Sequence, residues 1–117
     1  MENIEYINDC LRRYPEDIYK ASMRTEELRE AWQLTEARKD YETAKAFLTA
    51  KASGLTVGEA DKTATASVYE TAGAVIMAES SYRRAMADQL RLENEFVGVR
   101  KQASLLELTE MHMRKVA

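Results

Sequence analysis

Histidine and cysteine are the side chains most often used as metal ligands and nucleophiles, and the chain has one of each. No second ligand of the usual metal-binding type lies at helical spacing from His112. We expect this side chain to face solvent near the end of a helix, where positive charge is favoured. Cys10 has no histidine nearby to act as its base, so we expect Cys10 to be a small core residue rather than a nucleophile. These residues predict neither a metal site nor a catalytic cysteine.

The carboxylates and glycines also lack a catalytic arrangement. Several acidic residues flank a long apolar stripe, at positions that favour ion pairs between helices. Gly54 and Gly58 bracket a predicted loop, but no Gly-Lys-Ser/Thr sequence follows to bind a phosphate. We therefore predict that the protein is not an enzyme and needs no cofactor. The acidic residues in question are Asp88, Glu93, Glu95 and Glu107.

Basic side chains form the pattern of most chemical interest. On the outer face of the last predicted helix, arginine and lysine recur after Glu79, and no acidic residue shares their positions as far as Leu108. Such a strip suits the backbone of single-stranded nucleic acid, with aromatic side chains for stacking. A solvated helix face is the simpler interpretation. The candidate nucleic-acid-binding residues on this face are Arg83, Arg84, Arg91 and Lys101.

The composition predicts long helices in one domain, residues 1–117. Only 4 of the 117 residues are glycine and one is proline, while alanine, glutamate, leucine, lysine and arginine are abundant. The net charge of -3 argues against a typical duplex-DNA-binding protein. The N-terminal residues lack the pattern of a signal peptide, and no apolar run approaches the roughly 18 residues of a membrane span. We expect a cytoplasmic protein that does not enter membranes.

The N-terminal half predicts two helices. A short helix over residues 3–14 should end before Pro15, which disrupts a helix interior. A long helix should follow over residues 16–53. The sequence leaves two questions open: whether this helix breaks near Thr25, and whether the first helix folds back or extends the second. One apolar stripe is expected to face the last helix. It consists of Leu28, Ala31, Leu34, Ala37, Tyr41, Ala44 and Leu48.

The C-terminal half predicts one helix over residues 57–113. Gly54 is typical of a helix C-terminus, and Thr56 and Glu59 have the spacing of a capping box. Apolar residues then alternate at steps of four and three, which favours a coiled-coil seam and an antiparallel helical hairpin. The predicted seam consists of Thr71, Val75, Ala78, Tyr82, Ala85, Gln89, Leu92, Phe96, Val99, Ala103 and Leu106.

A second apolar stripe on the last helix falls outside this seam. It needs a cover, which the sequence allows to be the N-terminal helix, through Ile4, Ile7 and Leu11, or another subunit. We therefore expect a homo-oligomer. The stripe, our candidate for oligomer or partner contacts, consists of Met86, Leu90, Val97, Leu105 and Leu108.

Three short segments resemble small helical proteins of tailed bacteriophages that often accompany recombination genes. These segments are residues 41–46 (YETAKA), 55–60 (LTVGEA) and 78–85 (AESSYRRA). With the Arg100-Lys101 pair, the layout is similar to UvsY-type recombination mediators. The resemblance implies a homo-oligomer that binds single-stranded DNA and helps to load a recombinase. It also adds Arg100 to the candidate nucleic-acid-binding residues Arg83, Arg84, Arg91 and Lys101.

Two function classes follow from these patterns. The first is a phage-type accessory protein of DNA recombination or replication that binds single-stranded DNA as a homo-oligomer in the bacterial cytoplasm. The alternative is a helical protein-binding module, an inhibitor or adaptor of a host or phage protein, as in an anti-CRISPR role, without nucleic-acid binding. A purely structural coiled coil is a third interpretation.

Overall fold

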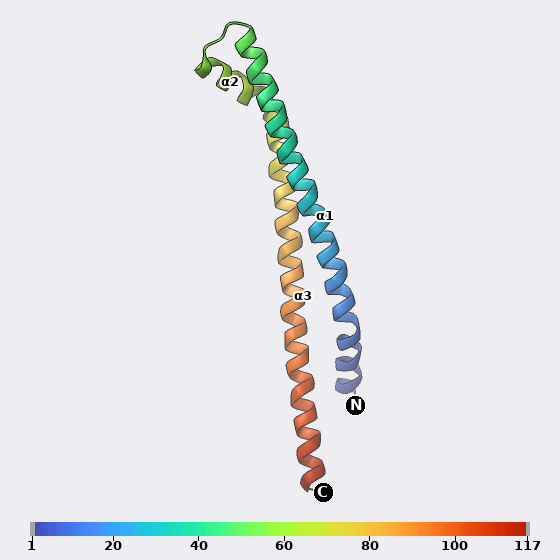
Figure 1. The fold of residues 1–117 in the computed structure, drawn as a ribbon. Coiled ribbons are helices and arrows are strands. Elements are labelled where there is room, and N and C mark those ends of the chain that lie inside the picture. Colours follow the sequence, from blue (N-terminus) through green and yellow to red (C-terminus); the bar gives the residue numbers. More distant parts are fainter. Residues whose placement is uncertain (1, 117) are drawn as a thin grey trace. The chain divides into compact units, whose positions relative to one another are not determined.

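The computed structural model describes residues 2–116, with the side chains of residues 4–115. These residues form α1 (Glu2–Ala52), α2 (Val57–Ser67) and α3 (Tyr69–Val116), and none of them lies in a strand (Figure 1). The chain divides into two compact units. Unit 1 combines Met1–Arg24 with Ala85–Ala117, and unit 2 is Thr25–Arg84. The all-helical prediction is confirmed.

α1 is continuous where the sequence predicted helix boundaries. It passes through Pro15 and through Thr25 without a break, so the separate helix over residues 3–14 was wrong. Proline removes the hydrogen bond to the carbonyl of Leu11 and crowds that carbonyl. The Pro15 ring itself is exposed, whereas Tyr14 and Ile18 on either side are half-buried. Packing of the side chains around the proline therefore outweighs its local cost.

The core of unit 1 is small and lies between α1 and α3. Ile7, Cys10 and Val99 are buried there, with Cys10 only 1% exposed, as the sequence predicted for it. The rings of Tyr14 and Phe96 lie 6.0 Å apart. Contacts join early residues of α1 to late residues of α3, so the two segments run antiparallel in this unit. The half-buried residues around the core are Leu11, Tyr14, Ala103 and Leu106.

Unit 2 contains the second antiparallel pair and α2. The ring of Trp32 on α1 stacks on that of Tyr82 on α3, with centroids 5.4 Å apart. α2 buries Ala60 and Ala64, which are four residues apart and therefore share one helical face, and Val68, directly after the helix, is buried as well. Small side chains on this face allow α2 to pack closely within the unit.

The predicted helix over residues 57–113 is interrupted at Val68. This residue has φ -105° and ψ 20°, outside the helical region, and it separates α2 from α3. The segment before it contains Thr63, Thr65 and Ser67, which have low helix propensity. Val68 itself is only 5% exposed. The break therefore lies at a buried residue after a segment of low helix propensity, and the sequence periodicity alone did not indicate it.

The loop between α1 and α2 agrees with its prediction. Gly54 has a positive φ of 95°, its N–H bonds to the carbonyl of Lys51, and the Leu55 N–H bonds to that of Ala50. This pattern is a Schellman motif, which satisfies the last carbonyls of a helix. Thr56 caps α2 by accepting from the Glu59 N–H at 3.3 Å. The loop therefore turns the chain sharply, with its backbone groups satisfied.

The seam prediction was right for α3 and wrong for α1. All eleven predicted α3 residues are buried or half-buried, each within its own unit. On α1, only Leu28 of the predicted stripe is half-buried, and the rest of the stripe is exposed. The observed unit 2 seam of α1 is more polar, so a search for apolar residues selected the opposite side of the helix. The buried and half-buried α1 residues of this unit are Thr25, Leu28, Trp32, Thr35, Lys39, Glu42, Thr43, Ala46, Phe47 and Ala50.

Candidate interaction surfaces

The outer face of α3 in unit 1 exposes five apolar side chains at the positions predicted to contact a partner. The N-terminal part of α1 does not cover them, because Ile7 and Leu11 pack with Val99 at the seam instead, and Ile4 is 42% exposed. That alternative for the second stripe is therefore contradicted. We call this stripe the α3 face; its residues and exposed fractions are Met86 47%, Leu90 57%, Val97 46%, Leu105 64% and Leu108 62%.

The α3 face is distinct from the seam and includes a lysine. At 3.6 residues per turn, its residues point about 150° away from the seam residues of the same helix. Lys101 lies between Val97 and Leu105, four residues from each. These three residues, with Arg100 and Ser104, line a shallow surface groove. Apolar contact and positive charge are therefore combined on one surface.

The predicted basic strip is divided between the two units, and part of it is already paired. In unit 2, Arg83 donates to Oε1 of Glu79 from Nη2 at 2.7 Å and from Nε at 3.0 Å. In unit 1, Arg91 Nη1 lies 2.9 Å from Oε1 of Glu95. No ion pair among the described residues involves the other three positions. Arg84 lies in unit 2 and is exposed, whereas Arg100 and Lys101 lie in unit 1.

Arg100 combines charge with an aromatic contact. Its guanidinium carbon lies 5.7 Å from the centroid of the Phe96 ring, within the range of a cation–π interaction. Phe96 belongs to the seam and is half-buried, so it holds the arginine stem against the helix. Of the predicted basic residues in unit 1, Arg100 and Lys101 therefore remain available to an acidic or phosphate-bearing ligand.

A carboxylate network joins the helices of unit 1. The Tyr14 hydroxyl donates to Oε2 of Glu95 at 2.9 Å, while Arg91 donates to the other oxygen. Both hydrogen bonds favour the charged carboxylate, that of Tyr14 more strongly, so they lower the pKa of Glu95. Donation to Glu95 in turn raises the pKa of Tyr14. The sequence predicted an interhelical ion pair for Glu95, but the interhelical partner is a phenol.

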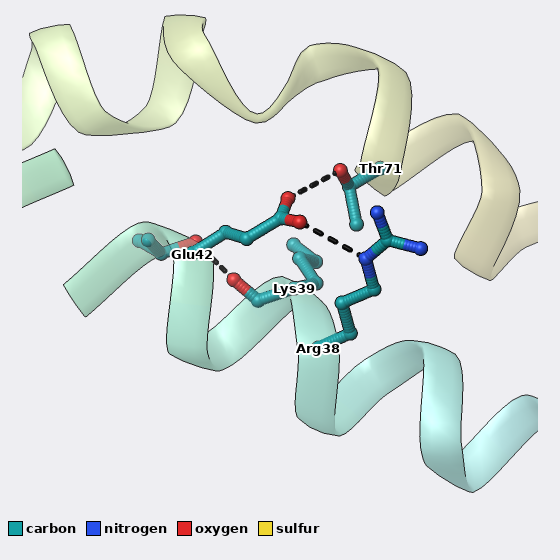
Figure 2. A network of polar contacts seen from close by, with 5 residues as sticks. Arg38, Lys39, Glu42 and Thr71 are labelled. Atoms are coloured by element: carbon teal, nitrogen blue, oxygen red, sulfur yellow. Dashed lines mark hydrogen bonds and ion pairs between the residues drawn. The ribbon is translucent and has the colours of Figure 1, made fainter. Parts of the chain in front are cut away.

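Unit 2 repeats this arrangement with the helices exchanged (Figure 2). Thr71 on α3 donates to Oε2 of Glu42 on α1 at 2.7 Å, and Arg38, four residues before Glu42, donates to Oε1 at 3.0 Å. These two hydrogen bonds, that of Thr71 first, lower the pKa of Glu42. Each unit therefore has one carboxylate that fixes the helix register, a structural role that leaves neither glutamate free for chemistry.

A second apolar surface, which the sequence had assigned to the seam, is exposed on α1 in unit 2. Leu34, Tyr41 and Leu48 are 71%, 68% and 67% exposed. Ala37 and Ala44 lie between them and are exposed too. We call these five residues the α1 face. The apolar spacing in the sequence identified the residues correctly, and Trp32, four residues after Leu28, was the overlooked sign of the true seam.

The described residues offer no evident metal or membrane site. Among them, no group of three or more histidine, cysteine, aspartate or glutamate side chains is arranged to hold a metal ion. None of their helices is long and apolar enough to span a membrane. His112 is exposed on α3, as expected. No family model, curated protein or solved structure matches the chain.

Proposed function

We propose that the chain is a non-enzymatic protein-interaction module whose α3 face binds an acidic amphipathic helix of a partner protein. The observation that supports this best is the exposure of all five apolar residues of that face. From Met86 to Leu108 the stripe extends for about 33 Å along the helix. Soluble monomers rarely expose contiguous apolar surface of this kind unless it binds something.

Charge on the α3 face indicates the chemistry of the partner. Lys101 lies in the middle of the stripe and Arg100 beside it, and neither is in an ion pair among the described residues. Of the acidic residues of the same segment, Asp88, Glu95 and Glu107 lie closer to the seam. Glu93 lies beside Leu90 and Val97, and its carboxylate accepts a hydrogen bond from Gln89. A partner helix with apolar residues at steps of three and four and acidic flanks would match this surface.

Site-specific photocrosslinking in the cells that express the chain tests the proposal. A photoreactive amino acid at Val97 should give one protein adduct, and the crosslinked peptide should come from an acidic amphipathic helix. The same group at exposed Asp17 on α1 is the matched control and should give none. Replacing Lys101 with Glu should lower the adduct yield at Val97 about tenfold, because it places like charges together.

Other outcomes of this experiment contradict the proposal. A protein adduct through a basic or non-helical segment would refute the stated partner chemistry, and adducts of equal yield at Asp17 would refute the surface. If neither position gives an adduct in cells, the α3 face has no partner and the proposal fails.

Single-stranded DNA binding by a homo-oligomer is a second candidate for the same face. Arg100 and Lys101 favour it, because free basic groups beside an aromatic ring suit a phosphate backbone and its bases. Recombinase loading, as in UvsY-type mediators, would then be the biological role. The ion pairs of Arg83 and Arg91 weigh against it. A nucleic-acid adduct at Val97 would support this candidate and overturn the first.

A further inference from the structure

The α1 face in unit 2 is an unpartnered helix face with coiled-coil spacing. Leu34, Tyr41 and Leu48 recur every seven residues, and Ala37 and Ala44 follow the first two by three residues. At 3.6 residues per turn these side chains point about 160° away from the α1 residues that face α3. Neither α2 nor α3 therefore covers them, as their exposure shows.

We propose that this face binds a second copy of the chain in parallel, so that two α1 helices form the centre of a homodimer. The two alanines allow the helix axes to approach closely, and Leu34, Tyr41 and Leu48 each meet their equivalents. Because α1 is already folded against α3, pairing does not have to offset the free-energy cost of forming the helix. The interface is separate from the α3 face, and the proposal does not depend on the proposed function.

The charges that flank the α1 face point to this occupant. Arg38 and Lys45 lie along one edge of the stripe, and Gln33 and Asp40 along the other. Neither Asp40 nor Lys45 forms an ion pair within the described residues, whereas Arg38 is bonded to Glu42. One helix therefore carries a basic edge and an acidic or amide edge, which is the pattern of a self-complementary coiled coil.

The same charges decide the orientation. In a parallel pair, each residue on the edge of Gln33 and Asp40 faces the residue five positions later on the basic edge of the other copy. Asp40 then faces Lys45 of the second copy, and Gln33 faces its Arg38, both twice by symmetry. In an antiparallel pair, equal edges meet, so Arg38 and Lys45 would face the same basic edge of the other copy. Like charges in that arrangement repel.

The size of the face predicts a reversible dimer. Three large side chains about two-thirds exposed, with two alanines, correspond to roughly 1,000 Å² of surface buried in total between two copies. That is the lower limit for a specific interface. Dimerisation should therefore depend on protein concentration.

Sedimentation equilibrium of matched tyrosine variants tests the pairing. The wild-type chain should dimerise, and Tyr41→Glu should raise the dimer dissociation constant at least about 100-fold, because it buries facing carboxylates. Tyr69→Glu, at a tyrosine that is 81% exposed in the same unit but outside the stripe, should leave the constant unchanged. Leu48→Glu is a second disruptive variant, at a side chain that is exposed in the single chain. Circular dichroism checks that each variant retains its helicity.

Disulfide trapping tests the orientation. In the parallel pair Ala44 faces its own equivalent, so Ala44→Cys should form a disulfide-linked dimer under mild oxidation, while Ala66→Cys on α2 should not. Cys10 is buried and does not compete. A monomeric wild type, or a dimer insensitive to both Tyr41→Glu and Leu48→Glu, would overturn the interface. A dimer that is sensitive to them but not trapped by Ala44→Cys would overturn the parallel arrangement.

Discussion

At the scale of single residues, two glutamates determine how the helices meet. Glu95 in unit 1 and Glu42 in unit 2 each accept one hydrogen bond from a hydroxyl group on the facing helix and one from an arginine on their own helix. In both glutamates the carboxylate is partly accessible, at 41% and 33% side-chain exposure. Such contacts stabilise the pairing modestly, but they favour one register over others.

The lowered pKa of Glu95 predicts a loss of stability in acid. A carboxyl whose pKa is lower in the folded than in the unfolded chain stabilises the fold above its unfolded pKa. That contribution disappears as the pH falls through the folded value. Since the ordinary pKa is 4.5, wild type should be more stable than Glu95→Gln at pH 7, and the difference should shrink below about pH 4.5 and vanish in stronger acid.

Urea denaturation at pH 7 and at successive lower pH values measures this effect. Glu36→Gln changes an exposed glutamate of α1 that forms none of the hydrogen bonds described for Glu95, so it is the control. A stability difference between wild type and Glu95→Gln that stays constant down to strong acid would show that the network in unit 1 does not hold the carboxylate in its charged form.

At the scale of elements, periodicity predicted the α3 seam and local chemistry predicted the α1–α2 loop. The seam of α1 was missed because it includes the polar residues Thr35, Lys39 and Glu42, which a search for apolar spacing passes over. Of these, Glu42 is bonded across the helices by Thr71, whereas Thr35 donates to the carbonyl of Ala31 within α1. The continuity of α1 through Pro15 was missed because packing outweighs local propensity there. The break at Val68 was missed because apolar periodicity was followed across Thr63, Thr65 and Ser67, whose helix propensity is low.

The sequence also located the α3 face but could not reveal which basic residues remain free. Arg83 and Arg91 each pair with a glutamate four residues away, and these ion pairs depend on side-chain rotamers selected in the folded helix. Exposure of the α1 face was missed because apolar spacing alone does not say which side of a helix faces its neighbour, and Trp32, which stacks on Tyr82, was overlooked.

Two glycines of unit 2 should respond oppositely to the same substitution. Gly54→Ala should destabilise the chain by about 1 kcal/mol, because φ at this position is +95° and alanine is strained there. Gly73→Ala, inside α3, should stabilise it by about 0.5–1 kcal/mol through helix propensity. A Cβ at either site meets no atom within 4 Å, so steric clashes do not contribute.

Thermal unfolding of the two glycine variants beside the wild type checks this pair. A fall in the melting temperature for Gly54→Ala with a rise for Gly73→Ala is the expected result. Two shifts of the same sign would contradict either the Schellman geometry at the end of α1 or the regular helix at Gly73.

At the scale of the whole chain, each unit uses one side of its helices internally and leaves apolar residues exposed on another side. Among the described residues, the buried core consists of few side chains, and several of these are alanine. Larger apolar residues lie outside, on the α3 face in unit 1 and on the α1 face in unit 2. We propose that these outer faces, rather than any cavity or cluster of titratable groups, are the functional surfaces of the protein.

Hydroxyl-radical footprinting tests this claim most directly, by comparing the dilute purified chain with the chain assembled in its native cells. Oxidation of Tyr41 on the α1 face and Leu105 on the α3 face should fall several-fold on assembly, whereas seam residues Tyr82 and Phe96 should react equally in both states. Equal oxidation of Tyr41 and Leu105 in the two states, or a change confined to Tyr82 and Phe96, would contradict the account.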